Sequence, residues 1–130
     1  MSTETIVTAS SKTMYDQFHF ADAVVSNGHI LCSGVLGTGE GGKEPTSILE
    51  EFQNAWRRVG EVLAEAGADY SDIIEYTSYH VGLQANLGDF MKARDEVISE
   101  PWPAWTAIGI TELAVPGAHV EIRVTAVKPD

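Results

Sequence analysis

Apolar residues recur every three or four positions between residues 48 and 66, and this spacing predicts one long amphipathic helix. Ser47 and Glu50 have the spacing of a capping box at its start. Gly67 follows the last apolar position, where a left-handed cap residue ends many helices. The predicted buried face contains Ile48, Leu49, Phe52, Ala55, Trp56, Val59, Val62, Leu63 and Ala66.

Alternation of apolar and polar residues predicts strands in other parts of the chain. The segment DIIEYTSYHVG predicts a strand over about residues 73–81. Two more strands are predicted at 104–113 and 119–127, with the turn VPGA between them. Short β-rich runs on either side of Asn27-Gly28 predict a hairpin, because this dipeptide suits a tight turn. The glycine-rich stretch at 35–46 predicts a surface loop.

Helical spacing also predicts a second, shorter helix that ends before Pro101. Its predicted residues are Phe90, Ala93, Arg94, Val97 and Ile98. The element order is then two strands, a helix, a strand, a helix and two strands. This order predicts an α+β fold in which both helices cover one face of a mixed β-sheet.

The other face of the sheet is expected to be polar and aromatic. In the last strand, Val120, Ile122, Val124 and Ala126 alternate with Glu121, Arg123, Thr125 and Val127. In the strand at 73–81, one face has Ile74, Tyr76, Ser78 and His80, and the other has Glu75, Thr77, Tyr79 and Val81. Such a face suits solvent or a subunit interface, and the Tyr and Trp content favours oligomerisation.

The composition limits the function classes. A chain of 130 residues with 44% hydrophobic residues is expected to be a single domain, residues 1–130, with one ordinary core. Its 19 acidic and 8 basic residues give a formal charge of −11. Because this charge repels phosphate backbones and the basic residues do not cluster, nucleic-acid binding is disfavoured. Cys32, in an apolar strand, is expected to be a core residue.

Membrane, metal and phosphate sites are not expected either. No segment approaches the roughly 18 apolar residues of a membrane span, and the N-terminal sequence has no basic patch before an apolar run, so we expect no membrane contact and a cytoplasmic protein. The four histidines lack the spacing of a metal site such as HxxxH. The glycines at 35–46 match no phosphate-binding pattern.

Three segments resemble the Rid or YjgF-like family of reactive-intermediate deaminases. They are FADAVVSNGHILCSGVLG, EEFQNAWRRVGEVLAEAGADYSDIIEYTSYHV and PAWTAIGITELAVPGAHVEIRVTAV, between Phe20 and Val127. The specific pieces are Ser33-Gly34, the run from Asn54 to Tyr79, and the pattern P.A.VEI..TA that ends at Ala126. The resemblance implies a chorismate-mutase-like fold and a homotrimer with ligand clefts between subunits. It also implies hydrolysis of enamines and imines to ketoacids and ammonia without metal or organic cofactor.

The sequence departs from the deaminating branch of that family at two ligand-contacting positions. An arginine after Pro-Ala binds the substrate carboxylate in that branch, and here the position is Trp105. The family's cleft tyrosine is matched by Phe20, which has no hydroxyl. PAWTAIGIT and TSYH resemble the YjgH-like branch, whose members also have this tryptophan. We expect Trp105 to stack on a flat ligand or to cap the cleft with apolar surface.

Four further residues complete the predicted site. Glu121 matches the family glutamate that positions water, and backbone amides near Gly34 and Ala107 are expected to point into the cleft. Histidine, with a usual pKa near 6.5, suits proton transfer at neutral pH, although a lone histidine at a strand end is more often structural. One hypothesis is that His80 and Glu121 together activate a water for attack on an iminium carbon.

Two classes of function remain open. The first is an enamine or imine deaminase-like hydrolase with altered specificity, which the retained Glu121 favours. The second is a non-catalytic trimer that binds a small metabolite or a partner protein, which the absent arginine and tyrosine favour. Ribonuclease activity, a label attached to relatives of the endoribonuclease L-PSP type, fits poorly with a charge of −11.

Overall fold

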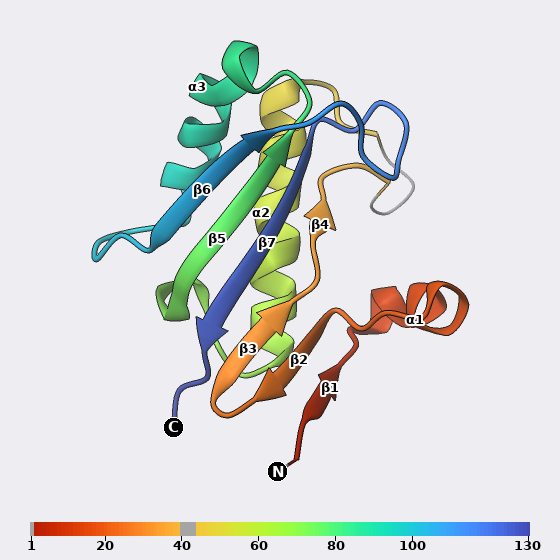
Figure 1. The fold of residues 1–130 in the computed structure, drawn as a ribbon, viewed down its shortest axis with the longest axis vertical. Coiled ribbons are helices and arrows are strands. Elements are labelled where there is room, and N and C mark those ends of the chain that lie inside the picture. The colour runs from red at the N-terminus through yellow and green to blue at the C-terminus, as the bar shows by residue number, and fades with distance from the viewer. Residues whose placement is uncertain (1, 40–43) are drawn as a thin grey trace.

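The computed structural model describes residues 2–39 and 44–130, and a mixed β-sheet forms its centre (Figure 1). The strands, in order across the sheet, are β1 (Glu4–Ile6), β2 (Ala23–Ser26), β3 (His29–Cys32), β7 (Val120–Val127), β5 (Ile73–His80) and β6 (Ala104–Gly109), and β4 (Val35–Leu36) also pairs with β7. The helices are α1 (Lys12–Phe18), α2 (Ile48–Glu65) and α3 (Leu83–Asp95). Figure 1 shows α2 and α3 on the same side of the sheet, which confirms the predicted α+β architecture.

The parallel pair β5 and β6 sets the position of α3. All other strand pairs in the described residues are antiparallel. A parallel pair needs a long crossover connection, and α3 lies in the connection from β5 to β6. Although β6 and β7 follow each other in the chain, β5 lies between them in the sheet. β6 is therefore the last strand in the sheet order, beside α3.

The prediction of α2 is confirmed, and its start has a modified capping box. The Ser47 hydroxyl accepts a hydrogen bond from the Glu50 backbone N–H at 3.0 Å. The Glu50 carboxylate accepts one from the Thr46 N–H at 2.9 Å, one residue before the usual partner. Gly67, just past the helix, has a φ of +85°, a conformation that favours glycine. The buried face packs on the sheet through Phe52, Ala55, Trp56, Val59, Val62 and Leu63.

The predicted hairpin is confirmed, but the elements near it were not predicted. Asn27 and Gly28 have φ values of +52° and +75°, as a two-residue hairpin turn of the primed type requires, and they join β2 to β3. The first two residues of the predicted loop at 35–46 form β4 instead, and residues 40–43 of that loop lie outside the described residues. Both β1 and α1 were also missed, because no periodic run of apolar residues marks them.

Two further predictions are corrected by the structure. Ile74 was expected to share one strand face with Tyr76, yet Ile73 is buried like Tyr76 and Ile74 is 45% exposed. A register shift between Ile73 and Glu75 explains this, since one extra residue in a strand reverses the alternation before it. The second helix begins seven residues before Phe90, at Leu83, and ends at Asp95, so Ile98 is buried beyond the helix rather than within it.

The sheet face turned away from α2 and α3 has the predicted mixed character. The pairs Thr77↔Arg123 and Tyr79↔Glu121 lie on this face. On the opposite face Cys32 is buried in the core, as predicted, and burial raises the pKa of its thiol to about 12. Within the described ranges, no helix combines the length and apolar character of a membrane span.

Candidate functional site

Trp105 lies on the helix-covered face of the sheet, at the edge formed by β6. It is paired in register with Tyr76, and their rings stack with centroids 5.8 Å apart at 15°. The indole also stacks on Phe90 of α3, again with centroids 5.8 Å apart. Its Nε1 donates a hydrogen bond to the Ser78 hydroxyl at 2.9 Å. These three contacts fix the plane of the indole.

His80 is a buried neighbour of the same serine. Its Nε2 lies 2.8 Å from the Ser78 Oγ, its side chain is 1% exposed, and the rings of Phe52 and Phe90 pack against it edge to face. Its Nδ1 is buried with no hydrogen-bond partner among the described residues. Burial lowers the pKa of His80 below its ordinary value of 6.5. The imidazole is therefore neutral at physiological pH and enclosed by the core.

The lowered pKa of His80 predicts a specific loss of stability in acid. The unfolded chain takes up a proton near pH 6.5, while the folded chain resists it down to the lower pKa. The free energy of unfolding therefore falls as pH decreases from 6.5, by up to about 1.4 kcal/mol per pH unit from this residue. His80→Gln keeps a group able to bond Ser78. We expect its unfolding free energy, measured by denaturant titrations at pH values from 7.5 to 5, to fall less with decreasing pH than that of the wild type. An equal decrease in both proteins would contradict this account.

Glu121 lies on the opposite face of the sheet from His80. The antiparallel pairing of β4 and β7 brings it against Gly34, and a Cβ added to Gly34 would collide with the Glu121 carboxylate. The close approach therefore requires glycine at position 34. Partial burial raises the pKa of Glu121 above its ordinary value. Of the predicted site residues, the structure thus brings Gly34 and Glu121 together.

The hypothesis that His80 and Glu121 act together on one water is corrected by this geometry. His80 pairs with Val120 and Tyr79 pairs with Glu121, and neighbours along a strand point to opposite faces. Within one chain the two side chains are separated by the sheet. Only Glu121 of the two is outside the helix-covered core.

The remaining predicted residues fall in two separate places. Ala107 pairs with Ser78 and shares the helix-covered face with Trp105, two residues along β6. Phe20 is half-exposed between α1 and β2, at the far side of the sheet from β6. One chain therefore does not gather Trp105, Phe20 and Glu121 around one cavity.

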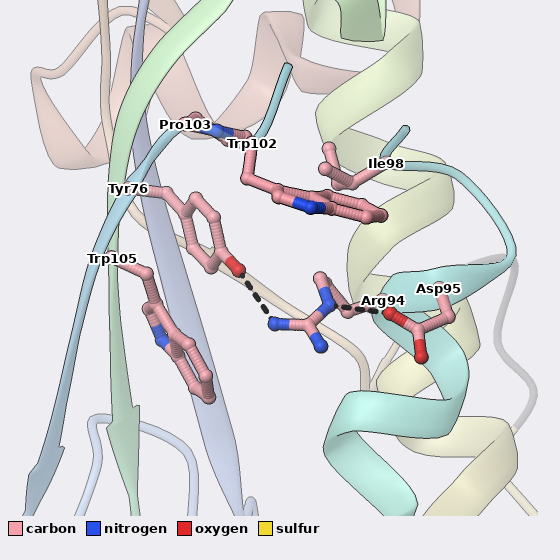
Figure 2. Close-up of a pocket in the computed structure, with 7 residues that line it drawn as sticks. All are labelled: Tyr76, Arg94, Asp95, Ile98, Trp102, Pro103 and Trp105. Atoms are coloured by element: carbon pink, nitrogen blue, oxygen red, sulfur yellow. Dashed lines mark hydrogen bonds and ion pairs between the residues drawn. The ribbon is translucent and has the colours of Figure 1, made fainter. Parts of the chain in front are cut away.

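A pocket of about 410 Å³ opens beside Trp105, between β6 and α3 (Figure 2). Figure 2 shows the Arg94 side chain reaching from α3 into the space between the three aromatic rings. Its Nη1 donates to the Tyr76 hydroxyl at 3.3 Å, and its Nε donates to the Asp95 carboxylate at 2.8 Å. The lining residues are Tyr76, Arg94, Asp95, Ile98, Trp102, Pro103 and Trp105.

Arg94 is the pocket residue whose role sequence reasoning missed. It was assigned to the second helix, among apolar positions at helical spacing. A charged residue within an apolar stripe is a usable signal, because burying a guanidinium is costly unless it has partners. Its partners Tyr76 and Trp105 come from two strands, and nothing in the local sequence places them beside α3.

Residues 11–128 match the family described as Endoribonuclease L-PSP. The chain belongs to this family. The match confirms the resemblance to YjgF-like proteins, and two relatives refine it. The chain is 32% identical over 123 residues to the RutC family protein YjgH of Escherichia coli strain K12. This alignment covers 94% of this chain and 92% of the relative. It is 30% identical to the 2-iminobutanoate/2-iminopropanoate deaminase of Capra hircus, over 84% and 80% of the two chains.

A solved structure confirms the fold of this family member. The structure of Protein YJGH matches with a TM-score of 0.88 at 29% identity, over 100% of this chain and 99% of that one. Among residues 2–39 and 44–130, no three His, Cys, Asp or Glu side chains lie close enough together to hold a metal ion.

Proposed function

We propose that this chain is an enamine or imine deaminase-like hydrolase with altered specificity, active in clefts between the subunits of a homotrimer. The observation that supports this most is the Glu121 carboxyl, which is packed on Gly34 with a raised pKa. A carboxylate with a raised pKa accepts a proton more readily than an ordinary one, and its carboxyl form can return that proton. The family includes a member named as a 2-iminobutanoate/2-iminopropanoate deaminase.

The proposed reaction needs only water and Glu121. Water attacks the iminium carbon while the Glu121 carboxylate accepts a proton from that water, and the C=N π electrons move to nitrogen. The Glu121 carboxyl then returns the proton to the nitrogen of the tetrahedral intermediate. The C–N bond breaks, ammonia leaves with the electron pair, and the hydroxyl becomes the carbonyl as its proton passes to solvent. The products are a keto compound and ammonium.

The distribution of the predicted residues supports a site shared between subunits. Trp105 and Glu121 are on opposite faces of one sheet, and Phe20 is near its other edge. A neighbouring copy can bring its own Glu121 face or Phe20 to the Trp105 edge. Exposed apolar side chains, among them Phe20 and Ile108 at 42% and 39% exposure, are suited to such an interface.

The test is hydrolysis of imines generated freshly from amino acids by an amino-acid oxidase. Ammonia and keto-acid release are measured with and without the protein, for imines with small and with aromatic side chains. We expect acceleration, greater for the aromatic imines because Trp105 adds apolar surface beside the site. Absence of acceleration with every imine, or a stable monomer in sedimentation at assay concentration, would contradict the proposal.

A binding protein without catalysis is the second candidate, and the environment of Trp105 favours it. The indole N–H is used by Ser78 and the ring stacks on Tyr76 and Phe90, so the indole itself supplies no acid or base to a reaction. Ligand binding without ammonia release by the wild type, and ligand binding that Glu121→Ala at most weakens, would identify this alternative.

A further inference from the structure

The pocket beside Trp105 has an arginine inside an aromatic frame. Arg94 comes from α3, its side chain is 17% exposed, and its guanidinium carbon lies 5.1 Å from the centre of the Trp105 ring. A guanidinium at this distance from a tryptophan ring is held by a cation–π interaction. The charge is thus fixed in position at the pocket wall, which a flexible surface arginine would not provide.

Arg94 still has hydrogen-bonding capacity to offer. Nη1 is bonded to Tyr76 and Nε to Asp95, whereas Nη2 has no hydrogen-bond partner among the described residues. A guanidinium binds a carboxylate best through two parallel N–H groups. The protons of Nη2, with the second proton of Nη1, are the donors available for such a contact.

The protonation states of the wall suit an anion. Burial alone would lower the pKa of Arg94, but its bonds to Tyr76 and Asp95 outweigh burial and raise it, so the guanidinium stays charged. For Tyr76, burial raises the pKa, so its hydroxyl keeps its proton and can donate a hydrogen bond. Asp95 is the carboxylate on this wall, and at 60% side-chain exposure it bonds Arg94 through Nε only.

The rest of the wall suits a flat apolar group. Tyr76, Trp102 and Trp105 present aromatic rings, and Ile98 and Pro103 complete the apolar lining (Figure 2). Aromatic walls bind planar conjugated groups by stacking. The volume of about 410 Å³ lies in the range of small-molecule sites.

We propose that this pocket binds a small planar carboxylate, aromatic or conjugated, through Arg94. The carboxylate is bound by the guanidinium fork and the planar group stacks between the aromatic side chains. The inference deepens the proposed function and rests on it for one point, the identification of this ligand class as that of the imine substrate. The alternative is a purely structural arginine that fastens α3 to the sheet.

Benzoate and benzamide distinguish the two roles. They have the same ring and nearly the same shape, but only benzoate has the charge that Arg94 would bind. Binding is followed by the indole N–H signals of Trp102 and Trp105 in NMR spectra during titration with each compound. We expect benzoate to bind about tenfold or more tightly than benzamide, because hydrogen bonds between charged groups are the stronger ones. Equal binding of the two compounds by the wild type would overturn the proposal.

Two glutamine variants give a matched test on one helix. Arg94→Gln and Lys92→Gln remove the same charge from α3, but Lys92 is exposed and does not line the pocket. We expect Arg94→Gln to abolish the preference for benzoate and Lys92→Gln to retain it. Equal loss in both would show a general charge effect and would overturn the proposal. If Arg94→Gln does not fold, Asp95→Asn decides, because removing the competing carboxylate is expected to tighten benzoate binding and a structural arginine predicts no such gain.

The binding test is independent of turnover. Benzoate contains no C=N bond, so its binding does not depend on hydrolysis. Binding of benzoate through Arg94 without ammonia release from imines would contradict the proposed hydrolysis and support this binding site. Hydrolysis of imines with equal binding of benzoate and benzamide would support the proposed function and contradict this inference.

Discussion

Glu121→Gln is expected to lower the rate of ammonia release from an accepted imine by about 100-fold or more, which is the usual contribution of a positioned acid–base group. The amide has nearly the same shape as the carboxyl, so it keeps the contact with Gly34 but cannot accept a proton from water. The measurement is kcat and kcat/KM for the wild type and the variant. We also expect the wild-type rate to rise with pH through the raised pKa of Glu121, because the base form lies above that pKa.

Glu75→Gln is the matched control for this experiment. Glu75 lies on the same sheet face, on β5, and accepts a hydrogen bond from the Thr125 hydroxyl at 3.0 Å. It is exposed and does not contact Gly34, so we expect its replacement to leave the rate nearly unchanged. An activity that survives Glu121→Gln, or that falls equally in both variants, would remove Glu121 from the reaction.

The elements that could be predicted are those specified by local sequence. The helical spacing and cap residues of α2 and the Asn27-Gly28 turn act within a few residues, so the pattern alone was sufficient. β4 has only two residues, and it becomes a strand because β7 pairs with it. The shift in β5 between Ile73 and Glu75 likewise depends on the partner strand. Such features are decided by tertiary pairing, which the pattern does not contain.

The candidate site shows the same division. Alternation correctly placed Tyr76, Ser78 and His80 on one face, and the same alternation, applied to Val120 and Glu121, already puts Glu121 across the sheet from His80. The contact of Gly34 with Glu121 needs the β4–β7 register. The approach of Arg94 to Trp105 needs α3 to cross over the β5–β6 pair. Residue types were therefore predictable, and the groupings that give them a chemical role were not.

Phe90→Ala is expected to cost about 3–5 kcal/mol of unfolding free energy, the range for removing a large buried aromatic side chain. Phe90 is 0% exposed at the centre of the contact between α3, α2 and the sheet. It packs edge to face on Phe52 and His80, stacks on Trp105 and lies 6.0 Å from the Trp56 ring. Alanine would leave a cavity among rings that belong to separate elements and cannot all move into it.

The same substitution on an exposed phenylalanine supplies the control. Phe18→Ala on α1 removes an identical side chain that is 64% exposed, and we expect less than about 1 kcal/mol. Both variants are compared with the wild type by urea unfolding at one protein concentration, because the stability of an oligomer depends on concentration. Similar losses in the two variants would show that the α3 contact is not a tight core. Phe90 also stacks on Trp105. We therefore expect Phe90→Ala to broaden the NMR signal of the Trp105 indole N–H and to weaken ligand binding in the adjoining pocket. The packing of this core is thus a condition for the binding site.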